Sequence, residues 1–128
     1  MNIRLSVVVC ISCCLLLLTA CNEGNVISSP RDIVFPDSIV KYQQHVQPWL
    51  ALSCNFSGCH ADGTQYPFTS YITLINTPGL IIFTKPESSR LTQVINGSLS
   101  HRYDIFNNMT ENHKKGMNTW IREGAKNN

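Results

Sequence analysis

The amino-acid sequence predicts a small all-α domain of about four helices, and two observations lead to this prediction. Apolar residues recur at intervals of three and four along segments 37–54, 85–97 and 110–124, and residues that begin or end helices flank each segment. Only segment 79–84 is rich in residues that favour strands, and the sequence offers it no convincing partner strand. We expect 79–84 to be a buried extended connector, with a short strand as the alternative.

The first helix is expected within segment 37–54, where Asp37 or Ser38 can cap it. Pro48 lacks a backbone donor and clashes with the turn before it, so a kink or a restart is expected just before Trp49. The apolar face of this helix consists of Ile39, Tyr42, Val46, Trp49 and Leu50.

Two shorter helices are expected next. Thr69 or Ser70 can cap a short second helix, and Pro86 suits the first turn of a third helix that Gly97 can end. The apolar face of the third helix consists of Leu91, Val94 and Ile95. Residues 98–108 are mostly polar and show no clear period, so they are expected to form a loop.

The last helix is the best defined of the four. Thr110 can cap it and Gly124 can end it. Gly116 lies in its interior, where glycine costs about 1 kcal/mol relative to alanine, and this indicates close backbone packing at that position. His113, Met117, Trp120 and Ile121 lie on one stripe of this helix. Of these, Trp120 and Ile121 are expected to pack against the first helix, Met117 is expected in the core, and His113 is left unassigned.

Residues 1–20 have the features of a secretory signal peptide. Arg4 supplies a positive charge, residues 5–18 form an apolar run, and small residues precede Cys21. The apolar run is shorter than the roughly 20 residues that span a membrane. Residues 18–21, Leu-Thr-Ala-Cys, resemble the lipobox of bacterial lipoproteins, which implies that Cys21 carries acyl chains. The alternative is a signal peptide that is cleaved nearby, with Cys21 incidental.

The lipobox resemblance sets the expected localisation and domain division. Several acyl chains would anchor the protein to a bacterial cell membrane, because one chain alone anchors only marginally. By analogy with well-studied lipoproteins, Asn22 is compatible with transfer to the outer membrane, with the protein facing the periplasm. Residues 21–36 contain two prolines and no period, which predicts a flexible tether, and residues 37–128 form the domain. The net charge of +2 argues against nucleic acid as a partner.

Processing of this kind would leave two of the six cysteines unmodified, Cys54 and Cys59. Outside the cytoplasm a free pair of thiols is expected to close as a disulfide or to react with a covalent partner. His60 follows the second cysteine directly, in the stretch Cys-Asn-Phe-Ser-Gly-Cys-His. This stretch could be a haem attachment site lengthened by two residues, a small disulfide loop, or half of a zinc site.

The haem interpretation is physically reasonable despite the longer spacing. Two thiols must reach the two vinyl groups of one porphyrin, and the following histidine must reach the iron. The usual attachment site has two residues between its cysteines. Here four intervene, so two extra residues must bulge outward, and Asn55 and Gly58 belong to the residue types that tolerate positive φ.

The chain from about Tyr42 to its end resembles the small single-haem c-type cytochrome domains of bacterial lipoproteins and of larger planctomycete-type cytochromes. Residues 46–63 resemble their helix leading into a Cys-x4-Cys-His attachment site. Residues 85–97 resemble their Pro-x-x-Ser-x-Leu helix, and residues 120–128 their closing Trp-Ile-x-x-Gly-Ala. The resemblance implies a cytochrome c-like fold of about four helices around one covalently bound haem c. It further implies that the sulfurs of Cys54 and Cys59 form the thioethers and that His60 is the proximal iron ligand.

The distal iron ligand stays open. The family usually places a Met-Pro pair in the loop before the last helix, and this chain has no such pair. Met109 is the favoured candidate because it directly precedes the last helix, although a lone methionine is more often a packing residue. His101, earlier in the loop, is the alternative, and an open position is the third choice. Ligation by methionine and histidine raises the reduction potential relative to ligation by two histidines.

These features predict a membrane-anchored electron carrier that acts between periplasmic or membrane redox partners. The sequence shows no pair of catalytic carboxylates, no nucleophile with its base and no phosphate-binding loop, so neither an enzyme nor a small-molecule substrate is expected. One alternative is a haem protein with an open distal site that acts as a sensor of small ligands or as an enzyme. The other is a haem-free lipoprotein, a binding or assembly module with a Cys54–Cys59 disulfide.

Overall fold

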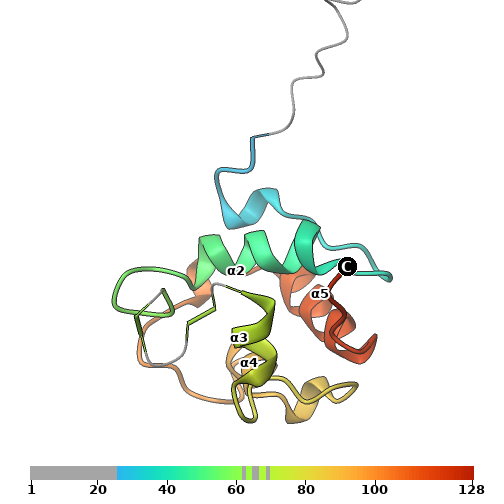
Figure 1. The fold of residues 1–128 in the computed structure, drawn as a ribbon. Coiled ribbons are helices and arrows are strands. Elements are labelled where there is room, and N and C mark those ends of the chain that lie inside the picture. Colours follow the sequence, from blue (N-terminus) through green and yellow to red (C-terminus); the bar gives the residue numbers. More distant parts are fainter. Residues whose placement is uncertain (1–25, 62, 65–66, 69) are drawn as a thin grey trace, which may run out of the picture.

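The computed structural model describes residues 26–61, 63–64, 67–68 and 70–128 (Figure 1). Within these ranges all regular structure is helical and no strand is present, which confirms the predicted all-α class. The α-helices of the described residues are α2 (Gln47–Ser53), α3 (Tyr71–Asn76), α4 (Arg90–Ile95) and α5 (Glu111–Arg122). Shorter turns are η1 (Pro30–Asp32), η2 (Tyr42–Val46), η3 (Pro86–Ser88) and η4 (Phe106–Asn108). None of the helices in the described part has the length and apolar character needed to span a membrane.

The first predicted helix is shorter than expected and is built in two parts. It begins at Tyr42 as the π-helical turn η2 and continues without a break into α2. Pro48 lies in the first turn of α2, directly after the change from π-helical to α-helical geometry at Gln47. The helix therefore changes geometry just before Trp49, but it does not restart there. Asp37 and Ser38 do not cap it. The side chain and the carbonyl of Asn128 instead accept hydrogen bonds from the first N–H groups of η2, at 3.1 Å each.

A left-handed turn at Ile39 interrupts the N-terminal part of segment 37–54, which is predicted to be helical. Ile39 has φ +56°, and the Glu123 carboxylate accepts hydrogen bonds from the N–H groups of Ile39 and Val40, at 2.7 and 3.0 Å. A β-branched residue with positive φ is an outlier, because its Cβ crowds the following carbonyl. The turn is therefore strained, and the carboxylate at the end of α5 holds it in place.

Replacing Ile39 with asparagine is expected to raise the free energy of unfolding by about 1 kcal/mol. Asparagine tolerates the left-handed region, where other residues pay roughly 1–2 kcal/mol, and the Ile39 side chain is 71% exposed, so little burial is lost. Val34→Asn is the matched control, because Val34 is β-branched, also 71% exposed and without positive φ. Chemical denaturation measures both. Equal effects of the two substitutions would contradict strain at Ile39.

The middle of the chain follows the predictions with small changes. Ser70 caps α3, accepting a hydrogen bond from the Thr73 N–H at 3.2 Å. The predicted third helix is divided into η3 and α4 by Ser89, whose buried hydroxyl bonds the Ile82 N–H and the Lys85 carbonyl. Segment 79–84 is a connector made largely of turns, with Leu80 and Ile81 buried, and it forms no strand.

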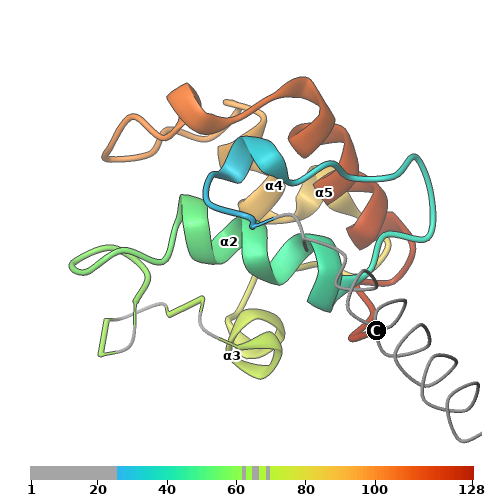
Figure 2. The same ribbon diagram turned by 90° about the horizontal axis from the view of Figure 1, so that it is seen from above.

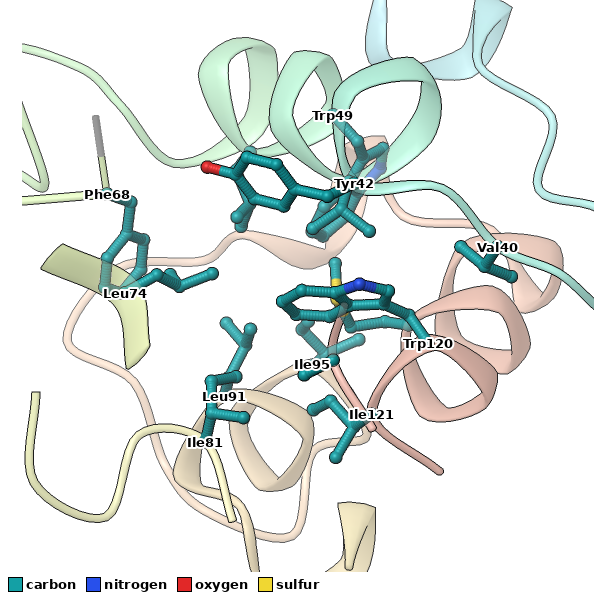
Figure 3. Close-up of a cluster of buried hydrophobic side chains, with 14 of the residues drawn as sticks. Val40, Tyr42, Trp49, Phe68, Leu74, Ile81, Leu91, Ile95, Trp120 and Ile121 are labelled. Atoms are coloured by element: carbon teal, nitrogen blue, oxygen red, sulfur yellow. The ribbon is translucent and has the colours of Figure 1, made fainter. Parts of the chain in front are cut away.

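The last helix forms as predicted. The Thr110 hydroxyl accepts a hydrogen bond from the His113 N–H at 3.3 Å, and the His113 ring accepts one from the Thr110 N–H at 3.1 Å, which closes a capping box. Gly124, with φ +95°, follows the C-terminal end of the helix. The stripe of His113, Met117, Trp120 and Ile121 is buried throughout, which places His113, left unassigned by the sequence, in the core. Trp120 packs against Tyr42 of η2 with ring centroids 5.8 Å apart, which confirms the expected contact between the first and last helices (Figure 3).

The prediction of a flexible tether over residues 21–36 is wrong for its second half. Ile33 and Phe35 are buried in the core, 3% and 2% exposed, and the segment that carries them runs beside α2 (Figures 1 and 2). The Asn112 side chain bonds both the N–H and the carbonyl of Phe35, at 2.8 and 2.9 Å. His113 lies 3.0 Å from the Ile33 carbonyl. The domain therefore begins at about residue 30 instead of 37. The predicted signal peptide and Cys21 lie outside the described residues.

One hydrophobic core holds these elements together (Figure 3). Side chains from η2 and α2 meet side chains of α5 on one side and of α3 and α4 on the other. Those labelled in Figure 3 are Val40, Tyr42, Trp49, Phe68, Leu74, Ile81, Leu91, Ile95, Trp120 and Ile121. The core fixes the end of α2 relative to α4, and these two helices form walls of the cavity described next.

Candidate haem-attachment site

A cavity of about 400 Å³ lies beside the C-terminal end of α2. The segment after α2, with Cys54, Cys59 and His60, forms one wall, and the inner face of α4 forms another. Residues 99–105 of the loop before α5 form a third wall, and Thr77, Pro78, Leu80 and Asn107 also contribute to the lining. Its volume falls in the range of about 300–1,000 Å³ that is typical of pockets for cofactors and small molecules.

The two cysteines lie on a compact bulged loop that begins where α2 ends. The Cys54 N–H donates to the Leu50 carbonyl at 2.9 Å, and the Cys59 N–H donates to the Phe56 carbonyl at 2.9 Å. Gly58 takes φ +78°, as the predicted bulge requires, and Phe56 is exposed at its tip. Both thiols are free, with Cys54 buried and Cys59 half-buried. The four intervening residues therefore leave the line of the helix, and both cysteines still line one cavity.

Phe68 fixes the orientation of the His60 ring. The two rings are stacked with centroids 4.0 Å apart and planes inclined by 4°, and the Phe68 N–H donates to the His60 carbonyl at 2.8 Å. Phe68 is buried, so the stack is anchored in the core. The imidazole that follows Cys59 is thus held in one place on the cavity wall.

His101 lies close to His60, whereas Met109 does not line the cavity. The His60 and His101 ring centroids are 6.1 Å apart, and both residues line the cavity. Met109 packs half-buried against the hydrophobic core. The structure therefore brings Cys54, Cys59, His60 and His101 together and leaves Met109 outside the cavity lining. The positions of His101 and Met109 in the sequence could not predict which of them lines the cavity, because they do not show how the loop before α5 folds.

The two other histidines, His45 and His113, lie outside the cavity lining and contact backbone atoms. His45 lies in η2, where its Nδ1 is 3.1 Å from the Lys41 backbone nitrogen. His113 is 2% exposed and contacts the Ile33 carbonyl within the core. Of the four histidines in the chain, His60 and His101 are the two that line the cavity. Among the described residues, no group of three or more histidine, cysteine, aspartate or glutamate side chains is arranged to hold a metal ion.

The residues around the cavity fit a haem group. Most of the lining surface is apolar, with Leu91, Val94 and Ile95 of α4 facing the two cysteines and His60. The Ser53 hydroxyl, which lines the cavity, is buried without a hydrogen-bond partner, as expected beside a site for a bound group or a water. Arg90 and Arg102 also line the cavity and supply positive charge suited to carboxylates such as the haem propionates.

Burial alters the chemistry of one of the two thiols. Burial, and to a lesser degree the neighbouring Cys59, raises the pKa of the Cys54 thiol to about 12. The thiolate is the nucleophilic form of cysteine, so Cys54 in the folded, haem-free protein is a poor nucleophile at neutral pH.

The free energy of unfolding of the reduced, haem-free protein is expected to fall as the pH rises from about 9 to about 12. The unfolded thiol ionises near its ordinary value of 9.0, whereas the folded thiol keeps its proton until about pH 12. The folded state thus binds more protons in this window, and the loss approaches about 1.4 kcal/mol per pH unit. Urea denaturation at a series of pH values measures it.

Cys54→Ala is the control for this pH dependence. Burial also raises the pKa of Tyr42, which adds a loss of the same sign at high pH, and this contribution remains in the variant. The difference between the two proteins therefore isolates the thiol. Parallel stability curves from pH 9 to 12 would show that Cys54 is not buried as described.

Comparison of the chain with protein-family models, with curated proteins and with solved structures finds no match.

Proposed function

We propose that this protein is a single-haem c-type cytochrome that carries electrons between redox partner proteins. The observation that carries the proposal is the convergence of Cys54, Cys59 and His60 on one mainly apolar cavity of about 400 Å³. In this proposal the two cysteine sulfurs hold haem c through thioether bonds and His60 binds its iron. When bound, the haem supplies an iron that gains and loses one electron.

The surrounding residues support a carrier more directly than an enzyme. Leu91, Val94 and Ile95 of α4 give the cavity an apolar wall, and Phe68 holds the His60 ring in one orientation. In this proposal the haem carries the redox chemistry, and the protein only has to bind, orient and shield it. We therefore propose no catalytic residue and no small-molecule substrate.

We further propose that acyl chains on Cys21 anchor the protein to a bacterial cell membrane, at the outer membrane facing the periplasm. Because the fold begins at about Pro30, only residues 22–29 separate the proposed anchor from the domain. Cys21→Ala is expected to move the protein from the membrane fraction to the soluble fraction without changing its covalent haem content. Membrane association of Cys21→Ala equal to that of the unchanged protein would contradict the anchor.

Covalent haem attachment is tested by producing the full chain in a bacterial host with the c-type maturation machinery. Intact mass is expected to show one haem per chain, and the haem is expected to stay attached after denaturation. Cys54→Ala and Cys59→Ala should each remove one thioether, and the double variant should carry no covalent haem. Cys14→Ala, in the predicted signal peptide, is the matched control and should leave the haem content unchanged.

The same experiment separates the competing functions. A colourless product whose Cys54 and Cys59 sulfurs are joined to each other would overturn the proposal and favour a haem-free binding or assembly module. A covalent haem that binds added carbon monoxide as fast as an open-site haem protein would instead favour a sensor or an enzyme. The expected product carries covalent haem and reacts slowly with carbon monoxide.

A further inference from the structure

We infer that His101 is the second axial ligand of the haem iron, so that two imidazoles hold the iron. This inference rests on the proposed haem attachment and adds a residue to it. His101 lies on the loop between α4 and η4, 41 positions after His60 in the numbering of the chain.

The distance between the two rings fits a shared metal. The centroids of His60 and His101 are 6.1 Å apart, and the ring planes are inclined by 39°. A metal-bound imidazole nitrogen lies about 2 Å from its metal, so two imidazoles on opposite sides of one metal have centroids roughly 6 Å apart. The observed separation matches that value, and both rings line the cavity that holds the two cysteines.

The backbone around His101 prepares one ring nitrogen for a metal. The Nδ1 atom of His101 lies 3.0 Å from the Tyr103 carbonyl oxygen and 3.3 Å from the Tyr103 nitrogen. Without a proton Nδ1 accepts the Tyr103 N–H, and with a proton it donates to the Tyr103 carbonyl; binding of a metal through Nε2 would select the second tautomer. The Nε2 atom then carries the lone pair. Ligating histidines commonly donate their other N–H to a backbone carbonyl in this way.

Other contacts hold the loop that carries His101. The Arg31 guanidinium donates to the Asn107 carbonyl at 2.7 Å, which ties the loop to the N-terminal segment. The Asp104 carboxylate accepts a hydrogen bond from the Phe106 N–H at 3.0 Å. These contacts fix the loop at its end near η4, three to six positions after His101.

Met109 is poorly placed to compete with His101. It packs against the core directly before the Thr110–His113 capping box, and the His113 ring in turn contacts the Ile33 carbonyl. The Met109 side chain would therefore have to leave its packing against the core to reach the cavity. His101 needs no such movement.

The test uses matured, haem-loaded protein and reads the iron ligands by spectroscopy. The unchanged protein is expected to show the low-spin ferric magnetic resonance and near-infrared magnetic circular dichroism of two imidazole ligands. The weak red absorption band that a methionine sulfur gives ferric haem should be missing. This measurement needs no variant, so it decides between His101 and Met109 even if a substitution prevents folding.

Three variants sharpen the assignment. His101→Gly is expected to become high-spin, and added imidazole should restore the low-spin spectrum. His101→Met should raise the reduction potential, because methionine ligation favours ferrous iron. Met109→Leu is the control and should leave the spectrum and the potential unchanged.

The outcomes separate this inference from the proposed function. A low-spin spectrum that survives in His101→Gly but is lost in Met109→Leu overturns the assignment of His101 and leaves the cytochrome proposal intact. A high-spin spectrum of the unchanged protein also overturns it, in favour of an open site. Unchanged protein that carries no covalent haem overturns the proposed function, and the ligand assignment fails with it.

Discussion

Trp120→Ala is expected to lower the free energy of unfolding by about 3–5 kcal/mol, the range for removing a large aromatic side chain from a core. Trp120 is fully buried, and its ring packs against Tyr42 at a centroid distance of 5.8 Å. The indole N–H also donates to the Lys126 carbonyl at 3.0 Å, which ties the C-terminal residues to α5. Domains of this size are usually stable by only about 5–15 kcal/mol, so the variant loses a large share of the total.

Trp120→Phe separates the two parts of this effect. Phenylalanine keeps most of the apolar contact with Tyr42 but cannot donate to the Lys126 carbonyl. The expected loss is about 1–2 kcal/mol, the usual contribution of one hydrogen bond with some loss of packing. Chemical denaturation followed by circular dichroism measures both variants. A loss below about 1 kcal/mol for Trp120→Ala would show that the first and last helices do not pack as described.

The same helix shows how much of the fold the sequence could predict. The start of α5 at Thr110, its inner face and the residue that ends it all follow from local rules of helix formation. The first helix followed its local pattern only from Tyr42 on. Its start depends on Asn128 and on the Glu123 carboxylate, both more than 80 residues away in the chain. No local pattern can encode a cap that arrives from the other end of the chain.

The N-terminal segment was mispredicted for a related reason. Ile33 and Phe35 are buried while Val34 between them is exposed, which is the alternation of an extended segment with one face against a core. The alternation extends over three residues next to two prolines, too short for a periodicity argument to detect. The partner that makes the segment ordered is Asn112, on α5, and the sequence gives no sign of this pairing.

The candidate site also has a part that the sequence could predict and a part that it could not. Cys54, Cys59 and His60 lie within one stretch of seven residues, so their spacing was enough to single them out. The residue that faces His60 comes from a separate loop, and the choice between Met109 and His101 depends on how that loop folds. Proximity to the last helix favoured Met109, but that same position directs its side chain onto the core. His101 is brought to His60 by tertiary structure alone.

Gly116→Ala is expected to lower the free energy of unfolding by about 2 kcal/mol or more, although alanine normally stabilises a helix interior by about 1 kcal/mol relative to glycine. A Cβ atom at position 116 would overlap the Cβ and Cγ atoms of Phe35. Overpacking of this kind costs about 1–3 kcal/mol and sometimes more. Phe35 cannot move away cheaply, because the Asn112 side chain holds its backbone on both sides.

The sign of this effect also tests where the domain begins. Arg122→Ala, at an exposed position of the same helix, is the control and should change stability by less than about 0.5 kcal/mol. If Phe35 belonged to a flexible tether, Gly116→Ala would find open space and stabilise the protein by the helix propensity alone. A destabilised variant instead requires that residues near Phe35 pack on α5. Because the contact at Ile33 and His113 lies one turn from Gly116, the same packing fixes the start of α5, which follows Met109 directly.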